Sequence, residues 1–225
     1  KMDDKISENV GIGWIEEAYD TDWLGAPWFM GVSAVNPDVC LASCQGFSWL
    51  TQDGGQTWHQ NYCDIYEDST YYGKNVECTS CHNILFDPFN PDAILMAYTD
   101  NGMLKSKNGG KKWYHTIKGV PFKWINTCYD VAFDPAVKGL VWSVWSSMHD
   151  LPRSKMFARD RFANSPIYGG VCITDNCVEL WHTSSEGLPE RGAYTSILLD
   201  PDSAVGNRTL YITQCPNGVY KSVDN

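Results

Sequence analysis

One short motif recurs along the chain and limits its possible folds more than any other feature. The copies at 51–58 and 106–113 begin with Thr or Ser, place Asp or Asn two residues later, continue with Gly-Gly and end on Trp. A degenerate copy at 174–181 keeps the Thr, the Asn and the Trp, and a further start lies at 222–225. The copies lie about 50–70 residues apart, a spacing typical of all-β repeats with several strands each.

The residue types of this motif are those of a tight hairpin turn. A hydroxyl and an Asp or Asn side chain can bond nearby backbone N–H groups, and Gly adopts the positive φ angles that such turns require. The Trp that ends each copy is expected to pack beneath the turn. We therefore assign structural roles to five residues of the motif: Asp53, Trp58, Asn108, Trp113 and Trp181.

A second repeated element is an Asp-Pro turn between two apolar, strand-like runs. It is seen at 86–88, 133–135 and 199–201, each time upstream of the Gly-containing motif. With both elements, the chain resembles the Asp-box or BNR-repeat β-propellers, a group that includes sialidases, xyloglucan-cleaving glycosidases, sortilin-type receptors and photosystem assembly factors. The resemblance implies an all-β fold, a β-propeller of four-stranded antiparallel blades with Asp-box hairpins.

The order of the repeats predicts how the chain is organised. We expect an N-terminal segment or closing strand at 1–24 and about four consecutive blades in 25–225. A propeller needs all its blades to close, and the sequence stops inside its fourth box. The chain is therefore expected to be a fragment of a larger propeller, with the remaining blades in the same precursor or in a partner chain.

Charge and cysteine content exclude some classes of function. Lys and Arg number 17 against 27 Asp and Glu, and the net charge of -10 would repel a nucleic-acid backbone. No apolar run reaches the ~18–20 residues of a membrane span. The chain has 9 Cys, and Cys172 and Cys177 flank a short turn, which predicts a hairpin disulfide and an extracellular or periplasmic location.

The sequence Cys78-Thr-Ser-Cys81-His82 matches the attachment pattern of c-type haem. Against this interpretation, the repeat places Cys81 on an inner strand, where consecutive side chains point to opposite faces. Structural or disulfide-forming cysteines are the alternative that we favour. We expect no metal and no cofactor, with haem kept as the minor alternative.

The chemistry of the related enzymes does not carry over directly. The resemblance to the xyloglucan-cleaving enzymes implies a catalytic Asp in the turn where this chain has Cys44. Without that carboxylate, their paired-carboxylate mechanism cannot be assigned. The arginine triad of sialidases is not recognisable either, because all five arginines lie late in the chain.

A basic insertion at 146–164 is the best candidate for a site, because long loops between strands often carry binding residues. His149 is the candidate general acid or base, with the adjacent Asp150, or Asp160, as its partner. Four basic side chains would neutralise a uronate, sulfate or similar group: Arg153, Lys155, Arg159 and Arg161. The alternative is a solvated, charged loop.

Aromatic side chains could stack against sugar rings. The candidates are Trp28, Tyr71 and Tyr72. The Tyr-rich stretch 62–75 is expected to be an exposed loop rather than a strand. The sequence thus favours a secreted propeller that binds a polysaccharide and, if catalytic, cleaves it as a glycoside hydrolase. The alternatives are a non-catalytic propeller that holds a protein or peptide, and a c-type haem protein.

Overall fold

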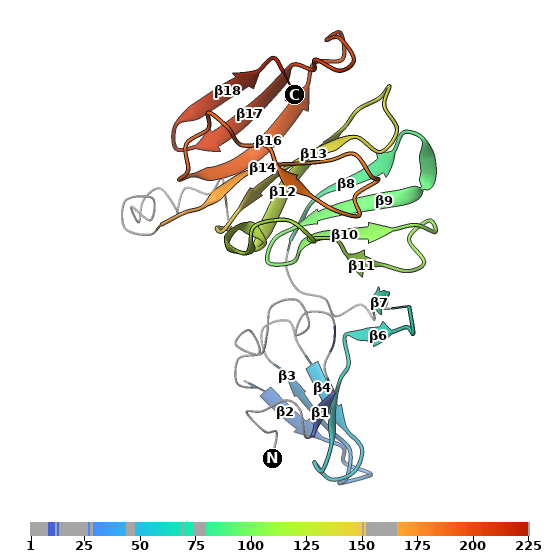
Figure 1. Cartoon of the computed structure of the whole chain (residues 1–225). Helices are drawn as coiled ribbons and strands as arrows, with labels where there is room; N and C mark the ends of the chain where they lie inside the picture. The colour runs from blue at the N-terminus through green and yellow to red at the C-terminus, as the bar shows by residue number, and fades with distance from the viewer. Residues whose placement is uncertain are drawn as a thin grey trace. The chain divides into compact units, whose positions relative to one another are not determined.

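A computed structural model of the chain describes residues 9–11, 13, 27, 29–43, 48–68, 70–73, 80–149, 151 and 166–224. Strands make up almost all the regular structure of these residues, with one short 3-10 helix, η2 (Phe122–Trp124) (Figure 1). The chain forms two compact units. The first comprises 1–79 with 111–115, and the second comprises 80–110 with 116–225.

The first unit contains a five-stranded sheet in the order β1-β5-β4-β3-β2. Its strands are β1 (Val10–Gly11), β2 (Phe29–Val32), β3 (Cys40–Ser43), β4 (Ser48–Thr51) and β5 (Trp58–Gln60). Strands β2 to β5 pair antiparallel in chain order, and β1 adds to β5 in parallel. We call β2–β5 the first blade. Its β4–β5 turn is the first copy of the motif.

The Tyr-rich stretch that follows is not the exposed loop that we expected. It forms a small antiparallel sheet of β6 (Cys63–Ile65) and β7 (Tyr71–Gly73), in the unit that also contains β11 (Tyr114–His115). Its first residue, Tyr62, is fully buried. The Gln60 side-chain oxygen accepts hydrogen bonds from the backbone N–H groups of Tyr62 (3.0 Å) and Cys63 (2.9 Å). These bonds fix the start of the hairpin.

The second unit contains three further antiparallel groups, which we call the second, third and fourth blades. The second is β8 (Cys81–Asp87), β9 (Asn90–Tyr98) and β10 (Gly102–Ser106). The third is β12 (Thr127–Phe133), β13 (Val141–Ser146), β14 (Gly169–Thr174) and β15 (His182–Thr183). The fourth is β16 (Ala193–Leu199), β17 (Leu210–Cys215) and β18 (Gly218–Ser222).

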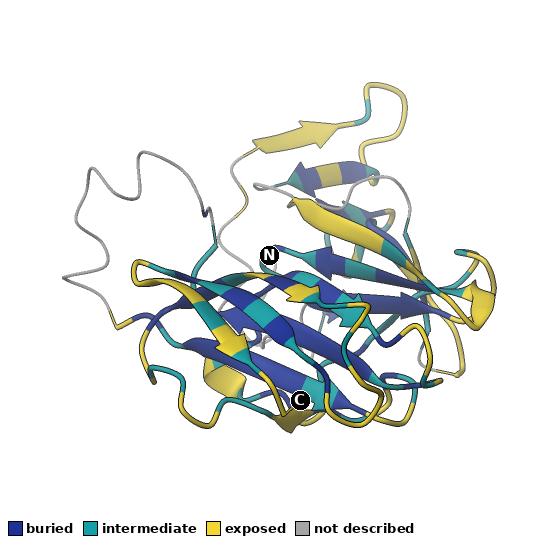
Figure 2. Ribbon diagram, turned by 90° about the horizontal axis from the view of Figure 1, so that it is seen from above, coloured by how far each residue is buried: buried dark blue, intermediate teal, exposed yellow. Residues whose placement is uncertain are grey.

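A hydrophobic cluster joins the third and fourth blades. Buried side chains of β13 and β14, such as Trp142 and Val171, meet buried side chains of β16 and β17, such as Tyr194 and Ile212. Figure 2 shows the buried residues along these strands and the exposed residues in the turns between them. On β17 burial alternates along the strand, as expected when one face of a sheet meets a core.

A buried ion pair also crosses from the third blade to the fourth. Asp134 lies in an Asp-Pro turn, where its carboxylate accepts hydrogen bonds from the backbone N–H of Ala136 (2.7 Å) and of Val137 (3.0 Å). Arg208 donates to both carboxylate oxygens, from Nε and from Nη2, each at 2.8 Å. The hydrogen bonds from Arg208 lower the pKa of Asp134 below its usual value. The turn residue is thus also a link between blades.

The all-β architecture and the antiparallel pairing within each group are confirmed. The second and third groups are not separate sheets, because β10 pairs in parallel with β12 at Gly102 and Thr127 and joins them into one sheet. The boundary expected between 24 and 25 falls outside the described residues and stays a prediction.

Candidate functional site

The turns formed by the repeated motif are the rigid frame on which the loops are placed. In the first turn Asp53 accepts hydrogen bonds from the Thr51 hydroxyl (2.8 Å) and from the backbone N–H of Thr57 (2.9 Å). Its other oxygen accepts from the Thr57 hydroxyl (2.6 Å). Together these bonds lower the pKa of Asp53 to about 2, and the bond from the Thr57 hydroxyl has the largest effect. The second turn repeats the pattern, with Ser106 donating to Asn108 at 3.0 Å.

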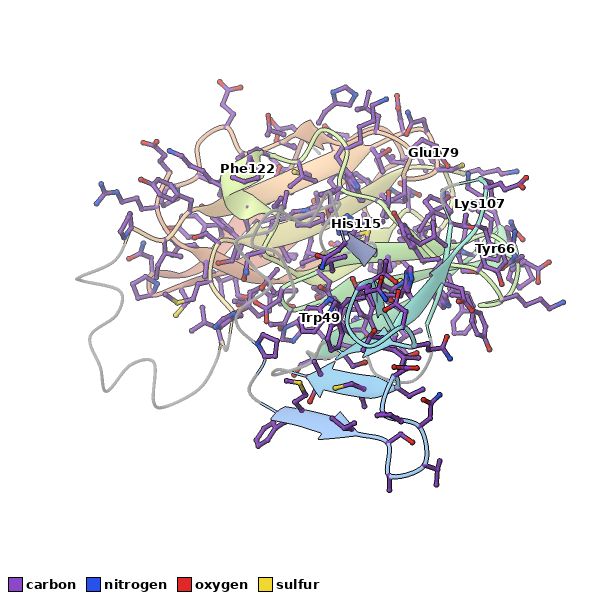
Figure 3. The ribbon with its side chains drawn as sticks, turned by 90° about the horizontal axis from the view of Figure 1, so that it is seen from below. Trp49, Tyr66, Lys107, His115, Phe122 and Glu179 are labelled. Atoms are coloured by element: carbon purple, nitrogen blue, oxygen red, sulfur yellow. The ribbon has the colours of Figure 1, made fainter. Side chains whose placement is uncertain are left out.

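The third turn keeps this geometry without glycines. The Thr174 hydroxyl donates to Asn176 at 2.8 Å, and Asn176 accepts from the backbone N–H of Leu180 at 3.1 Å. Cys177 and Val178 adopt positive φ angles of 60° and 68°, close to the 68° and 86° of the two glycines in the second turn. Nearby, Lys105 and Lys107 reach Glu179 at 3.0 and 2.8 Å, and Figure 3 shows Lys107 and Glu179 on the same side of the ribbon.

The hairpin disulfide expected between Cys172 and Cys177 is not formed in the structure, where both are free thiols. Cys172 lies in the middle of β14, where it is fully buried and pairs with Ser143 and Thr183. Cys177 lies in the turn, where its Sγ is 3.0 Å from the position that a Cβ on Gly139 would take. The strand and the turn thus direct the two thiols to different surroundings.

The loops that join the second and third strands of neighbouring blades bring two titratable side chains together. Asp100 lies in the β9–β10 loop, and His149 lies at the start of the β13–β14 connection. His149 Nδ1 and Asp100 Oδ1 are 2.6 Å apart, a distance at which the ring N–H donates to the carboxylate. The His149 side chain is 42% exposed and that of Asp100 is 13% exposed. The imidazole therefore faces solvent, with a shielded carboxylate behind it.

Asp100 is held in place by its backbone and by an amide. Its φ angle is 62°, a conformation in which Asp is tolerated better than most residues. Asn126 Nδ2 donates to the same carboxylate oxygen at 3.1 Å. The side-chain oxygen of Asn126, Oδ1, in turn accepts a hydrogen bond from the Thr127 hydroxyl at 2.9 Å, and this bond fixes the orientation of the amide.

A second histidine lies close to the strand ends that carry this pair. His82 Nε2 is 2.6 Å from the hydroxyl of Thr99, the residue before Asp100. The His82 ring lies 4.6 Å from the Tyr129 ring, centroid to centroid. The Tyr129 hydroxyl donates to the Met148 carbonyl at 2.8 Å and accepts from the Leu151 N–H at 3.2 Å. Tyr129 thus holds both sides of the segment that carries His149.

This arrangement can move a proton. A carboxylate on Nδ1 fixes the tautomer and orientation of the imidazole, and a histidine held in this way can act as a general base or acid. The partner of His149 in the structure is Asp100, which the sequence analysis did not single out. A signal was present, because Thr99, the residue before Asp100, lies seven residues before Ser106, as Cys44 lies seven residues before Thr51.

Most other expected site residues lie outside the described part of the chain. These are Asp150, Arg153, Lys155, Arg159, Arg161 and Trp28. Tyr71 and Tyr72 are described and belong to the first unit, whereas His149 belongs to the second. Tyr71 is only 7% exposed, whereas Tyr72 is 47% exposed. Of the two, only Tyr72 presents its ring to solvent. Sugar stacking by either residue stays a prediction.

The haem pattern is described only in part, because Cys78 lies outside the described residues. Cys81 is exposed at the start of β8, and the adjacent His82 ring contacts Thr99 and Tyr129. Among the residues that the structure describes, no group of three or more His, Cys, Asp or Glu could hold a metal ion. Haem attachment stays an untested prediction.

Of the box tryptophans, Trp58 and Trp181 are buried, and the Trp113 ring is partly buried. The Trp181 indole N–H donates to the Thr116 carbonyl at 3.1 Å, and its ring meets that of Trp145 edge to face. A cavity of about 1060 Å³ lies apart from the His149 pair, between the third and fourth blades.

The comparisons with known proteins find solved structures of similar shape but do not identify a family for this chain. No family model matches the sequence, and no curated protein matches it. The chain is similar to an ancestral GH74 enzyme, with a TM-score of 0.49 and 16% identity over 85% of this chain and 24% of that one. It is also similar to a GH74 xyloglucanase from Xanthomonas campestris, with a TM-score of 0.44 and 11% identity over 97% of this chain and 31% of that one.

A further similar structure is that of YCF48 bound to D1 peptide, with a TM-score of 0.39 and 12% identity over 89% of this chain and 65% of that one. The chain spans between 24% and 31% of the length of the two GH74 enzymes. Identities and TM-scores this low give no ground for transferring an activity. Within the described residues, no helix is long and apolar enough to cross a membrane.

Proposed function

We propose that this chain is the glycan-binding part of an extracellular or periplasmic β-propeller that acts on a polysaccharide, with His149 as its acid–base group and Asp100 as the orienting carboxylate. The observation that carries the proposal is the 2.6 Å contact between His149 Nδ1 and Asp100 Oδ1 on adjacent interstrand loops. Nothing in the fold requires a half-exposed imidazole with a shielded carboxylate at this place, and proton transfer uses such a pair.

The sequence that follows His149 favours an acidic glycan. The insertion carries Arg153, Lys155, Arg159 and Arg161 within a chain whose net charge is -10. Guanidinium groups bind carboxylates and sulfates in bidentate fashion, so they would hold a uronate or a sulfated sugar beside the imidazole. A positive side chain beside a uronate carboxylate would also stabilise the negative charge that develops when a neighbouring proton is removed.

The described carboxylates favour chemistry at the histidine over a two-carboxylate mechanism. Asp130, the other acid on a strand near this end, is fully engaged: Oδ1 accepts from Asn83 at 3.0 Å, and Oδ2 accepts from Ser196 at 3.1 Å. A glycosidase of the usual kind needs two carboxyl groups across the scissile bond. Proton transfer through His149 needs only one acid, Asp100, to orient the ring.

The test is a panel of neutral and acidic polysaccharides, assayed for binding and for the release of new reducing ends. Ultraviolet absorbance of an unsaturated product separates elimination from hydrolysis. We expect His149→Ala to lower turnover by about 10²–10⁴-fold and Asp100→Asn to lower it less, because Asn keeps the shape but loses the charge. Matched controls are His182→Ala and Asp202→Asn, both at exposed positions.

Two results would count against this proposal. Full activity of His149→Ala, or an equal loss in His182→Ala, would remove the pair from the reaction. Absence of both binding and cleavage across the panel would favour the alternative, a non-catalytic propeller that holds a protein or peptide. The observation that favours this alternative is that the sequence has Cys44 where the xyloglucan-cleaving enzymes that it resembles have a catalytic Asp.

A further inference from the structure

The short helix η2 is anchored on the third blade by its last residue. The Trp124 ring lies on Gly170 of β14, so close that a Cβ on this glycine would be 2.5 Å from the ring. The backbone N–H of Trp124 donates to the Pro121 carbonyl at 2.8 Å, and Ile125, which follows the helix, is buried. The helix packs against β13 and β14 of the third blade. Its place in the second unit is therefore fixed by buried contacts.

Asn126 connects η2 to the carboxylate that holds His149. Its side-chain amide donates to Asp100 at 3.1 Å, and Asp100 in turn contacts His149 at 2.6 Å. Lys123, the middle residue of η2, precedes Asn126 by three residues. Three residues of chain span at most about 11 Å. The backbone of Lys123 therefore lies within about 11 Å of the residue that positions Asp100.

Tyr168 connects η2 to the segment that carries His149. The Lys123 ammonium lies over the Tyr168 ring, 4.6 Å from its centroid. The Tyr168 carbonyl accepts from the backbone N–H of Ser147 at 2.7 Å, and the Tyr168 N–H donates to the Ser147 hydroxyl at 2.9 Å. Ser147 precedes His149 by two residues. The Asn126 and Tyr168 connections together place η2 beside the pair, at one end of the second unit.

Phe122 and Lys123 are the exposed residues of this anchored helix. Phe122, labelled in Figure 3, is 80% exposed, although Trp124 and Ile125 are the residues that hold η2 in place. Its ring therefore contributes little to the fold. Because the backbone beneath it is fixed, the ring can contact a ligand at a small cost in conformational entropy. The Lys123 ammonium, placed by the Tyr168 ring, adds a positive charge next to it.

An exposed aromatic ring beside an ammonium group matches the chemistry of an acidic sugar. The apolar face of a sugar ring packs against an aromatic ring, and a carboxylate on the sugar pairs with a cation. The chain as a whole has a net charge of -10 and repels an anionic polymer. Such a polymer is therefore held only where positive side chains are gathered, and Lys123 is one that the structure describes near His149.

We propose that Phe122 and Lys123 form a subsite for a uronate unit of a polysaccharide, next to the sugar that lies at His149. The Phe122 ring stacks on the apolar face of the uronate, and the Lys123 ammonium binds its carboxylate. This inference rests on the proposed function for its place in a reaction. It deepens that function by assigning the acidic-sugar specificity to a described helix, in addition to the insertion that follows His149.

The probes are tetrasaccharides of glucuronate, galacturonate and mannuronate, each paired with its neutral, carboxyl-reduced form. Their affinities for the 225-residue protein are measured by isothermal titration calorimetry, both for the unchanged chain and for His149→Ala, which does not consume the probe by acid–base catalysis. We expect at least one acidic tetrasaccharide to bind with a Kd below about 1 mM and its reduced form to bind more weakly. No binding by any of the three acidic probes would overturn the proposal.

Lys123→Met and Phe122→Ala are compared with the controls Lys138→Met and Phe89→Ala, which change exposed side chains in the β12–β13 and β8–β9 turns. Lys123→Met should weaken binding of the acidic probe at least about threefold and reduce its dependence on NaCl, without weakening the neutral form. Phe122→Ala should weaken the acidic probe by a similar factor and leave the salt dependence unchanged, because stacking needs no charge. Melting temperatures show that each variant is folded.

Failure of the subsite and failure of the proposed function give different results. The subsite is overturned if the affinity for the acidic probe is the same in Lys123→Met as in Lys138→Met, or the same in Phe122→Ala as in Phe89→Ala, even where His149→Ala lowers turnover. The opposite result is weaker probe binding in both η2 variants together with full turnover by His149→Ala. It would support the subsite and remove the His149 pair from the reaction.

Discussion

Replacement of Trp181 by Ala is the sharpest test of how the blades pack. The side chain is 1% exposed, its ring lies 6.2 Å from that of Trp145 at 76°, and its N–H bonds the Thr116 carbonyl. Truncation of a buried Trp to Ala costs about 3–5 kcal/mol, and the lost ring contact and hydrogen bond are included in that range. Because whole domains are stable by about 5–15 kcal/mol, the loss is a large share of the total.

The assay is urea unfolding followed by far-ultraviolet circular dichroism, which does not depend on the fluorescence of the removed ring. With a slope near 2 kcal/mol per M, a loss of about 4 kcal/mol lowers the midpoint by about 2 M. The slope itself should not change. Trp181→Phe keeps an aromatic ring but leaves the Thr116 carbonyl without this donor, so we expect a smaller loss of about 1–3 kcal/mol.

Phe122→Ala is the matched control for removing an aromatic ring. Phe122 is 80% exposed on η2 and is labelled in Figure 3, so its loss should change stability by no more than about 0.5 kcal/mol. The reasoning is refuted if Trp181→Ala loses less than about 1 kcal/mol or behaves like Phe122→Ala.

Two further predictions follow from the buried charges and thiols. Asp134→Asn should lower the urea midpoint at pH 7, and its difference from the unchanged chain should shrink as the pH falls below about 4, because the hydrogen bonds from Arg208 lower the pKa of Asp134 in the folded chain. The sign follows because a lowered folded-state pKa adds stability above the ordinary pKa, which is lost on acidification; a pH-independent difference would contradict it. Burial raises the pKa of Cys172 to about 12, so iodoacetamide at pH 8 should modify this thiol only after unfolding, as measured by peptide mass mapping. Rapid labelling of the native chain at Cys172, or a disulfide there, would contradict the structure.

The link from Asp134 to Arg208 shows how a local turn signal acquires a role between blades. The Asp-Pro turn is readable because Asp134 bonds the N–H groups two and three residues later. The arginine that completes the pair comes 74 residues later, from the turn between β16 and β17. No local pattern marks that partner, since its position depends on how two sheets stack.

Sequence alone was enough for the features that local geometry controls. The hydroxyl, the Asp or Asn, and the positive-φ positions of each turn lie within five residues of one another, so their hydrogen bonds depend little on the rest of the chain. This explains why the turns at 51–58, 106–113 and 174–181, and the strands around them, could be predicted. The third turn kept its shape even with Cys177 and Val178 in the glycine positions.

Only the tertiary structure decided which distant side chains meet. Asp100 and His149 are 49 residues apart, and their contact depends on two neighbouring blades presenting their loops at one end. The sequence pointed to the acids that follow His149 in the chain, among them Asp150, which lies outside the described residues, so that expectation stays a prediction. The contact with Asp100 could not be read from the sequence, because stacking of blades is not visible there. The same reason applies to Gly119: nothing in the sequence shows that its Cβ position is taken by the Trp181 carbonyl oxygen, 62 residues later in the chain.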